Sequence, residues 1–315
     1  MIIARERSEI TLDLASGSCV TIGNFDGVHM GHQKLIGRVV AMARTRGMKS
    51  VVVSFCPHPL RVLVGPHTPP FITVRDRKLD LLEGLGVDMV LLVNFTKELA
   101  SMAPETFVEE YLVGWLNTRE LVVGYDYSFG KGRKGNFELL KARGAVHGFG
   151  VEQLDPVIIN GAIVSSTRIR DIIRAGDVWG VKPLLGRFYV VQGSVVHGKD
   201  RGGRLLGFPT ANLELENELY PDNGVYAVWV QTEDGVRRRG MANIGSNPTF
   251  NNKDTTVEVH ILDFDQDIYD QRLTVHFVQR LRDEMKFSGL DALIAQIKAD
   301  IALGRTILDS PEAQL

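Results

Sequence analysis

Residues 19–32 read CVTIGNFDGVHMGH. The first four residues form a short run typical of a buried strand, and three glycines follow at Gly23, Gly27 and Gly31. An amphipathic pattern over residues 32–46 then predicts a helix. Glycine lets the backbone turn sharply and approach a ligand closely. The unpaired N–H groups at a helix N-terminus attract phosphate. The stretch therefore predicts a strand, a phosphate-binding turn and a helix.

Strand-like and helix-like segments alternate through the first half of the chain. Further strands are predicted near residues 51–55, 89–95, 121–123 and 151–157, and further helices near residues 74–84, 104–116 and 136–143. Strands joined by single helices need crossover connections, so they form a parallel sheet that is covered on both faces. Ligands of such sheets bind at the carboxyl ends of the strands. We therefore expect a Rossmann-like α/β domain with a cleft formed by the turns after Ile22, Phe55 and Val123.

The pattern changes near residue 186. Short strands are predicted at residues 188–191, 225–230, 241–244, 257–262 and 273–278, and no strong helix follows until residues 290–307. Strands without intervening helices suggest an antiparallel sandwich or barrel. We predict an α/β domain over residues 1–186, then an antiparallel β-barrel domain with a C-terminal helix over residues 187–315.

The composition argues against several classes of protein. A length of 315 residues favours two domains. The 36 Lys and Arg against 38 Asp and Glu lack the basic excess of a general nucleic-acid binder. No apolar run approaches the roughly 18 residues that cross a bilayer, and the charged start does not resemble a secretory signal. Cys19 and Cys56 are expected to be free thiols of a cytoplasmic protein that binds neither nucleic acid nor membrane.

Two histidines at the start of the predicted helix are candidate phosphate ligands. His29 and His32 are three residues apart, so both imidazoles can face one side of the first turn and donate hydrogen bonds to phosphate oxygens. Together with Cys56 and His58 they could also suggest zinc, but the glycine-rich turn favours an anion. Residues 130–135 read GKGRKG and match G-x-G-x-x-G by letter only, because a dinucleotide fingerprint belongs to the first strand–helix turn.

Four motifs in order carry a resemblance to a known family. H-x-G-H after a first strand resembles the nucleotidylyltransferase superfamily. The longer string over residues 23–32, with the segments at residues 55–59, 123–130 and 164–170, resembles the bacterial bifunctional riboflavin kinase/FMN adenylyltransferase (FAD synthetase) family. The resemblance runs from about residue 20 to residue 300. It implies an N-terminal domain that transfers an adenylyl group from ATP to FMN.

The resemblance also implies which side chains serve that reaction. His29, His32 and Arg170 would act on the reacting phosphates, with Arg170 near the triphosphate. ATP would be bound by Gly23, Phe25, Asp26, Gly27, His29, Gly31, His32, Ser166, Thr167 and Arg170. The flavin would be bound by Asn24, Pro57, His58, Pro59, Asp126 and Phe129. From their residue types alone, Ser166 and Thr167 could simply cap a helix, and Asn24 and Asp126 could be turn residues.

The second half of the chain lacks a P-loop but holds a glycine-rich cationic loop. Residues 198–212 read GKDRGGRLLGFPTAN, and the final PTAN resembles the magnesium and ATP motif of riboflavin kinases. Thr210 and Asn212 lie two apart, so on an extended segment they share a face, and both offer oxygen ligands that suit Mg²⁺. The resemblance implies ATP binding by Gly198, Lys199, Arg201, Gly202, Gly203, Gly207, Pro209, Thr210 and Asn212. The alternative to an ATP-binding loop is that these residues form an ordinary exposed hairpin loop.

Two further segments complete the kinase assignment. Thr256 to His260 resembles the family strand that bears a catalytic Glu, which implies Glu258 as the general base. By alternation alone, Glu258 would be a solvent-facing strand position. Asn247, Pro248 and Thr249 resemble a flavin-side loop, although Asn-Pro also marks a turn.

The expected function is a two-step synthesis of a flavin cofactor. ATP would phosphorylate riboflavin to FMN with Mg²⁺ as cofactor, giving ADP, and a second ATP would convert FMN to FAD and pyrophosphate. The chain is expected to be a monomer or a weak homo-oligomer. Two alternatives stand beside this one: a monofunctional relative with one silent site, and a flavin-binding sensor that has lost its chemistry.

Overall fold

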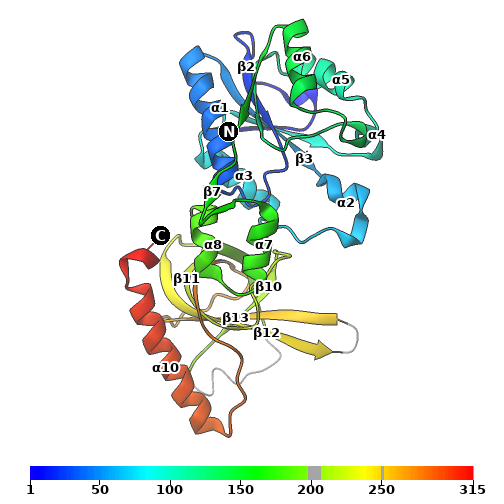
Figure 1. Cartoon of the computed structure of the whole chain (residues 1–315). Helices are drawn as coiled ribbons and strands as arrows, with labels where there is room; N and C mark the ends of the chain where they lie inside the picture. The colour runs from blue at the N-terminus through cyan, green and yellow to red at the C-terminus, as the bar shows by residue number, and fades with distance from the viewer. Residues whose placement is uncertain (198–206, 250–251, 315) are drawn as a thin grey trace. The chain divides into compact units, whose positions relative to one another are not determined.

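The computed structural model describes residues 1–197, 207–249 and 252–314. By internal packing these residues form two compact units (Figure 1). The first comprises Met1–Pro70 and Arg75–Ser165, and the second Phe71–Val74 and Ser166–Leu315. None of the helices in the described ranges is long and apolar enough to cross a membrane.

The first unit contains a six-stranded parallel sheet, as the alternating pattern predicts. Its strand order is β1-β4-β3-β2-β5-β6, and every neighbouring pair is parallel. The strands are β1 (Ile2–Ala4), β2 (Ser18–Ile22), β3 (Lys49–Cys56), β4 (Met89–Asn94), β5 (Thr118–Gly124) and β6 (Gly150–Leu154). From β2 the chain winds outward through β3 and β4 on one side and returns to β5 and β6 on the other. The winding direction therefore reverses beside β2, and such a switch point is where α/β sheets bind ligands.

Helices cover both faces of this sheet, because its strands are apolar on both sides. Those of the first unit are α1 (Met30–Arg46), α2 (Pro59–Leu63), α3 (Arg75–Gly84), α4 (Lys97–Ala100), α5 (Pro104–Phe107), the π-helix η3 (Val108–Trp115) and α6 (Phe137–His147). Short 3-10 turns occur at η1 (Arg7–Glu9), η2 (Gly65–His67) and η4 (Lys131–Arg133). The predicted helix over residues 104–116 is thus an α-turn followed by a π-helix.

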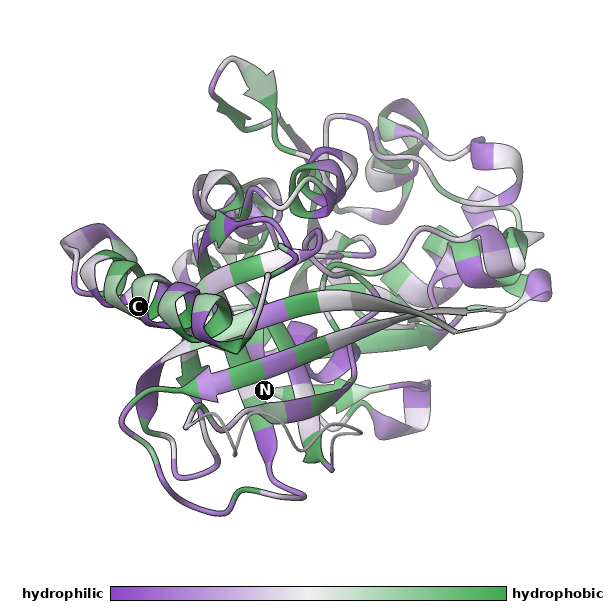
Figure 2. Cartoon of the chain, turned by 90° about the horizontal axis from the view of Figure 1, so that it is seen from below, coloured by the Kyte–Doolittle hydropathy of each residue, from purple (hydrophilic) through white to green (hydrophobic). Residues whose placement is uncertain are grey.

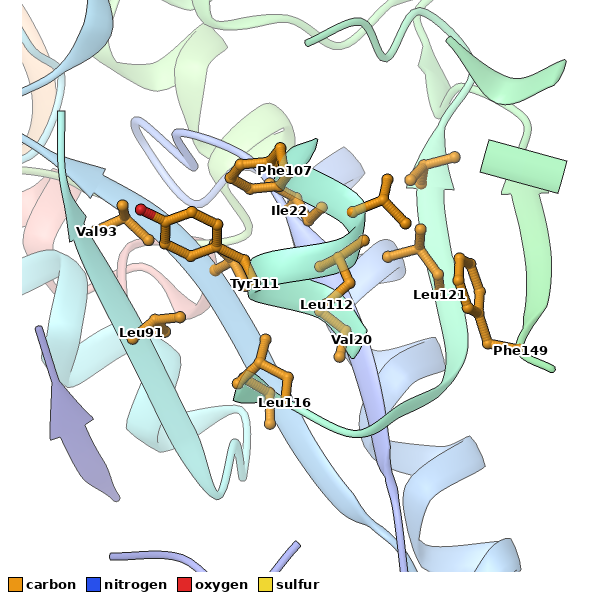
Figure 3. Close-up of a cluster of buried hydrophobic side chains, with 14 of the residues drawn as sticks. Val20, Ile22, Leu91, Val93, Phe107, Tyr111, Leu112, Leu116, Leu121 and Phe149 are labelled. Atoms are coloured by element: carbon orange, nitrogen blue, oxygen red, sulfur yellow. The ribbon is translucent and has the colours of Figure 1, made fainter. Parts of the chain in front are cut away.

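Each face of the sheet has its own apolar core. On one face, Phe107, Tyr111 and Leu112 of α5 and η3 pack against strand residues that include Val20 and Leu91 (Figure 3). On the other face, α1 and α3 pack against β3, β4 and β5 through a cluster that includes Leu35, Ile36, Val39, Leu82, Val52, Val90 and Val122. The two cores fix the carboxyl ends of β2, β3 and β5, where the turns predicted to form the cleft begin.

The second unit is built on a closed antiparallel barrel. The strand order is β10-β13-β12-β11-β14-β9, and β9 pairs with β10 to close it. The strands are β9 (Tyr189–Val196), β10 (Ala211–Leu215), β11 (Gly224–Gln231), β12 (Arg237–Thr249), β13 (Asn252–Ile261) and β14 (Arg272–Arg282). Hydrophobic and hydrophilic residues alternate along part of the barrel strands (Figure 2), for example over Val257–Ile261 of β13, as expected where one face fills the barrel interior. Buried aromatic residues fill the interior, among them Tyr189, Tyr226 and Phe277.

Three helices and a 3-10 turn accompany the barrel strands. They are α7 (Ser166–Arg174), α8 (Val178–Leu185), α10 (Leu290–Leu308) and η5 (Pro311–Ala313). Helix α10, the predicted C-terminal helix, packs on the outer wall of β11, β12 and β14. Helix α8 packs on β9 and β14, and by packing Ser166–Leu315 belongs to the second unit together with Phe71–Val74. The short ribbon β7 (Ile158–Ile159) and β8 (Ala162–Ile163) precedes it. A domain boundary at residue 186 stays a prediction.

Candidate active sites

The turn after β2 is held in a strained conformation. Phe25 and Val28 have φ values of 51° and 39°, in the left-handed region that side-chain-bearing residues avoid, and Gly27 has φ 86°. Phe25 and Val28 are almost fully buried, so packing holds them there. A Cβ on Gly23 would lie 2.9 Å from the Phe25 ring, which explains the glycine. Backbone strain that the surroundings impose is concentrated at ligand sites.

The two histidines predicted to face one side of the helix start do so. His29 is the N-cap of α1, and its side chain accepts a hydrogen bond from the His32 backbone N–H at 3.3 Å. The two imidazoles stack with centroids 3.5 Å apart and planes 19° apart. The Phe25 ring meets His32 edge-on at 5.2 Å. Because Nδ1 of His29 accepts, a neutral ring carries its proton on Nε2 and can donate there. A Cβ on Gly31 would lie 3.1 Å from the His29 ring.

Burial disfavours the charged form of His32. Burial lowers the pKa of His32 well below its ordinary value, and the charges of His29 and Lys78 lower it further. The Nδ1 atom of His32 is buried without a hydrogen-bond partner within the described part of the chain, and so is Oδ1 of Asn24. Buried polar atoms normally have partners, and exceptions need an explanation. A polar ligand bound at this turn would supply the missing partners.

Lys78 is a component of this site that the motifs do not reveal. It lies on α3, and its Nζ donates hydrogen bonds to the carbonyl oxygen of Asn24 at 3.2 Å and to Oγ of Ser54 at 3.4 Å. Burial lowers the pKa of Lys78, while the charges of Asp26 and Cys56 oppose that shift. The surrounding sequence, RDRKLD, reads as an exposed charged helix, so the sequence held no signal for an internal lysine.

The predicted flavin residues after β3 start a short helix. His58 is the N-cap of α2, with Nδ1 accepting from the Leu60 N–H at 3.1 Å, and Pro59 is the first helical residue. Pro57 follows a cis peptide bond. Cys56 is a free thiol that interacts with the Arg75 guanidinium. The described residues contain no group of three His, Cys, Asp or Glu that could hold a metal, so the zinc alternative gains no support.

The predicted flavin residues after β5 differ in their surroundings. Asp126 is exposed on the turn. Phe129 is half-buried and packs on Phe107, with ring centroids 5.7 Å apart. A backbone bridge from Phe129 to Gly135 closes residues 130–135 into a tight turn. This turn follows the fourth strand of the prediction, β5, and not the first, as expected for a chance match to a dinucleotide fingerprint.

Ser166, Thr167 and Arg170 lie on α7. Ser166 is the first residue of that helix, and Arg170 lies one turn further on. By packing they belong to the second unit, whereas His29 and His32 belong to the first. Their action on one triphosphate with the two histidines stays a prediction that rests on the family resemblance.

The barrel carries a second candidate site on its outer wall. A cavity of about 400 Å³, within the range of small-molecule sites, is lined by barrel residues and by α10. Thr210 and Glu258 both line it. Val257 and Val259 point into the barrel core, so Glu258 between them is on the outer face, as alternation predicts. Side chains of α10, Leu293 and Ile297 among them, line the same cavity, so Glu258 is half-buried there.

Backbone pairing brings further polar residues beside Glu258. Asn212 on β10 and Asn243 on β12 lie directly opposite it, one on each side, and so share its face of the sheet. Thr210, just before β10, also borders a smaller hollow of about 160 Å³ lined by residues that include Ala211, Ile261 and Asp267. The structure therefore places Thr210 between two hollows and Asn212 beside Glu258.

A buried ion pair lies at the same cavity. Nη2 of Arg282 and Oδ2 of Asp300 are 2.9 Å apart, and Nε2 of Gln296 donates to Oδ1 of Asp300 at 2.8 Å. The Arg282 guanidinium lies over the Phe287 ring at 5.8 Å. The cavity thus combines apolar walls with a few charged, hydrogen-bonding side chains, a combination suited to a flat heterocycle with carbonyl and N–H edges.

Several predicted kinase residues can be placed only in part. Gly207 and Pro209 border the loop before β10, where the Pro209 carbonyl oxygen lies 2.7 Å from Nδ1 of His260. Asn247, Pro248 and Thr249 lie in strand β12 rather than in a loop, and pair with residues 252–254 of β13. The remaining predicted residues lie outside the described part of the chain: Gly198, Lys199, Arg201, Gly202 and Gly203.

Comparisons with known proteins match each half of the chain to a family. The FAD synthetase family matches residues 12–168, and the riboflavin kinase family matches residues 185–308. The bifunctional riboflavin kinase/FMN adenylyltransferase of Pseudomonas fluorescens is 42% identical over 292 residues, which cover 92% of this chain and 93% of that protein.

This chain belongs to the bifunctional riboflavin kinase/FMN adenylyltransferase family. Members from Escherichia coli K12 and Bacillus subtilis are 38% and 36% identical, each over 90% of both chains. A solved structure of a Streptococcus pneumoniae protein, called a macrolide-efflux protein, superposes with a TM-score of 0.88 at 35% identity, over 97% of this chain and 99% of that one. The family resemblance and the fold class expected from the sequence are confirmed.

Proposed function

We propose that the chain carries out both reactions of its family in succession. ATP phosphorylates riboflavin to FMN at the barrel, and FMN is then adenylylated to FAD at the parallel sheet, with release of pyrophosphate. The observation that carries the proposal is that each unit brings its candidate catalytic residues together. Thr210 and Glu258 line one cavity, and His29 stacks on His32 at the start of α1. A monofunctional relative or a sensor finds no support, since both family matches are present.

In the kinase reaction, Glu258 serves as the general base. Its carboxylate accepts the proton of the riboflavin 5′-hydroxyl as that oxygen attacks the γ-phosphorus of ATP. The bond from the γ-phosphorus to the bridging oxygen breaks, and ADP leaves. The hydroxyl of Thr210 and the amide oxygen of Asn212 are hard oxygen ligands next to Glu258, so they fit Mg²⁺. That ion, when bound, neutralises phosphate charge.

The position of Thr210 between two hollows suits a transfer between two substrates. The larger cavity, with Met241 and Phe287 on its apolar walls, accepts the flavin ring. The smaller hollow accepts part of ATP. The transferred phosphoryl group then passes near Thr210, which borders both.

In the adenylyl transfer, no general base is required, because the phosphate of FMN is already an anionic nucleophile. Its oxygen attacks the α-phosphorus of ATP, the bond to the β-phosphate oxygen breaks, and pyrophosphate leaves. His29 and His32 donate hydrogen bonds to phosphate oxygens, and the helix N-terminus adds its dipole. Ser166, Thr167 and Arg170 complete the triphosphate site by family resemblance. Catalysis is positioning and charge stabilisation.

The test follows both products over time. Purified protein is incubated with riboflavin, ATP and Mg²⁺, and the flavins are separated at intervals. FMN is expected first, then FAD. Glu258→Gln should block FMN formation while added FMN is still converted to FAD, and His29→Asn, which preserves the helix cap, should do the reverse. Equal loss of both activities in either variant would contradict the two-site proposal.

We also infer the state of the protein in solution. It acts as a cytoplasmic monomer or weak homo-oligomer on riboflavin, FMN and ATP, and it needs neither nucleic acid nor membrane. Light scattering after gel filtration, with and without flavin and ATP, measures the mass and tests the oligomeric state.

A further inference from the structure

An internal lysine lies where the phosphates are expected to bind. Lys78 reaches from α3 to the carboxyl ends of β2 and β3, and its ammonium group joins the two by hydrogen bonds to the Asn24 carbonyl oxygen and to Oγ of Ser54. An ammonium group has three donors, so one remains for a ligand oxygen. The bond to Asn24 braces the strained turn that precedes His29.

Burying the Lys78 ammonium group costs free energy. Burial disfavours its charged form, and among the described residues no carboxylate forms an ion pair with Nζ. Its direct partners are neutral oxygens, and Asp26 acts on it only as a nearby charge. A desolvated cation of this kind gains stability when a polyanion binds beside it. Structures tolerate such groups mainly at functional sites.

The charge of Lys78 also acts on the histidine pair. Around His32, the described titratable and charged groups are His29 at the helix start, Lys78 on α3 and, beyond Lys78, Asp26 on the turn and Cys56 at the end of β3. Two stacked imidazoles 3.5 Å apart cannot both carry charge without strong repulsion. A fixed positive charge nearby disfavours the first protonation as well.

We propose that Lys78 is a positioning residue of the adenylyl-transfer site: it ties the glycine-rich turn to the end of β3 by two hydrogen bonds, and its positive charge adds to the effect of burial beside the stacked histidines. This inference rests on the proposed adenylyl transfer. A neutral His32 can stay stacked on His29 without repulsion between two charged rings. The same cation adds to the attraction for the triphosphate.

Three substitutions at this position separate charge from hydrogen bonding. Lys78→Met removes both, Lys78→Gln keeps a donor without charge, and Lys78→Arg keeps the charge. Lys97→Met, which removes an exposed lysine on α4, is the matched control. We expect Lys78→Met to lower kcat/KM for FMN adenylylation by about 10- to 100-fold, as loss of a charged hydrogen bond does. Riboflavin phosphorylation at the barrel should stay at the wild-type rate in every variant.

The deciding readout is the titration of His32. Protonation of His32 should inactivate, so a higher pKa moves the acid limb of kcat/KM to higher pH. Lys78→Met and Lys78→Gln should both move that limb to higher pH and shift the ring carbon resonance of His32 in the same direction. Lys78→Arg and Lys97→Met should leave both at the wild-type position, and the His147 resonance should move in none of them.

The outcomes separate the positioning role of Lys78 from the adenylyl transfer on which it rests. A fall in rate without a shift of the acid limb and of the His32 resonance overturns the positioning role, because loss of a structural brace alone would behave so. Unchanged rate in Lys78→Met or Lys78→Gln overturns it too. Should the wild-type protein make FMN but no FAD, the proposed adenylyl transfer fails, while the resonance of His32 still tests its coupling to Lys78.

Discussion

Removing the carboxylate of Asp300 should destabilise the barrel and weaken its hold on riboflavin. In Asp300→Ala, the Arg282 guanidinium loses the oxygens that lie 3.2, 3.0 and 2.9 Å from its nitrogens, and Gln296 loses its acceptor. The Asp300 side chain is 8% exposed and that of Arg282 18%. Breaking a buried pair from one side costs about 3–5 kcal/mol.

For Asp300→Ala we expect the lower end of this range of lost stability. Arg282 keeps its hydrogen bond to the Asp283 carbonyl oxygen at 2.9 Å, and its partial exposure lets water solvate the charge. We therefore expect a loss of about 3 kcal/mol. For a unit of this size that loss lowers Tm by roughly 6–12 °C. Riboflavin affinity should fall as well, because both side chains line the cavity that contains Glu258.

Calorimetry measures the barrel transition, which is identified by its rise on adding riboflavin. Arg282→Met combined with Asp300→Leu should recover most of the lost stability, because paired apolar residues replace the ion pair, yet it should not recover riboflavin binding. Conversion of added FMN to FAD is the control for the first unit. A drop in Tm of less than about 2 °C in Asp300→Ala, or a double variant as unstable as the single one, would refute the reasoning.

Four other outcomes are expected. Gly31→Ala should preserve thermal stability but lower FAD formation, since its Cβ would lie 3.1 Å from the His29 ring; a product time course checks this. Burial raises the pKa of Cys19 to about 11, so mass spectrometry after iodoacetamide at pH 8 should find Cys56 alkylated first and Cys19 only on unfolding. His32 binds its proton less well folded than unfolded, so stability should be full above pH 6.5, its ordinary pKa, and fall by about 1.4 kcal/mol per pH unit below it; His32→Gln should flatten that slope in urea titrations. EDTA should stop FMN formation, and added Mg²⁺ should restore it.

Much of the fold follows from local patterns. The central strands are continuous apolar runs, and the turn after Ile22 combines glycines with a helix start, so a parallel sheet and its ligand edge could be predicted. The barrel strands lack intervening helices and were predicted for that reason. The edge strand Ile2–Ala4 was missed because it has three residues and charged residues follow it. The grouping of residues by packing, in which Ser166–Leu315 lies in the second unit, depends on contacts that α8 makes with distant strands and so shows no local pattern in the sequence.

The two candidate sites could also be predicted only in part. Stacking of His29 on His32 follows from their spacing on one helix, and the pairing of Asn212 with Glu258 lies within the motifs that carry the family resemblance. Lys78 could not be predicted, because its burial depends on how α3 packs over β3. Nor could the pair of Arg282 and Asp300, which joins a barrel strand to the last helix and shows no pattern in sequence.

Closure of the barrel affects how readily this protein aggregates at high concentration. Among the described residues, every barrel strand has a neighbour on both sides, so the barrel offers no exposed strand onto which another polypeptide could add. The parallel sheet has two edge strands, β1 and β6. β1 is only three residues long and charged residues follow it, and β6 carries Glu152, which is paired with Arg38. Short or charged edge strands discourage the addition of another strand, so the native protein should resist fibre-like aggregation even at high concentration.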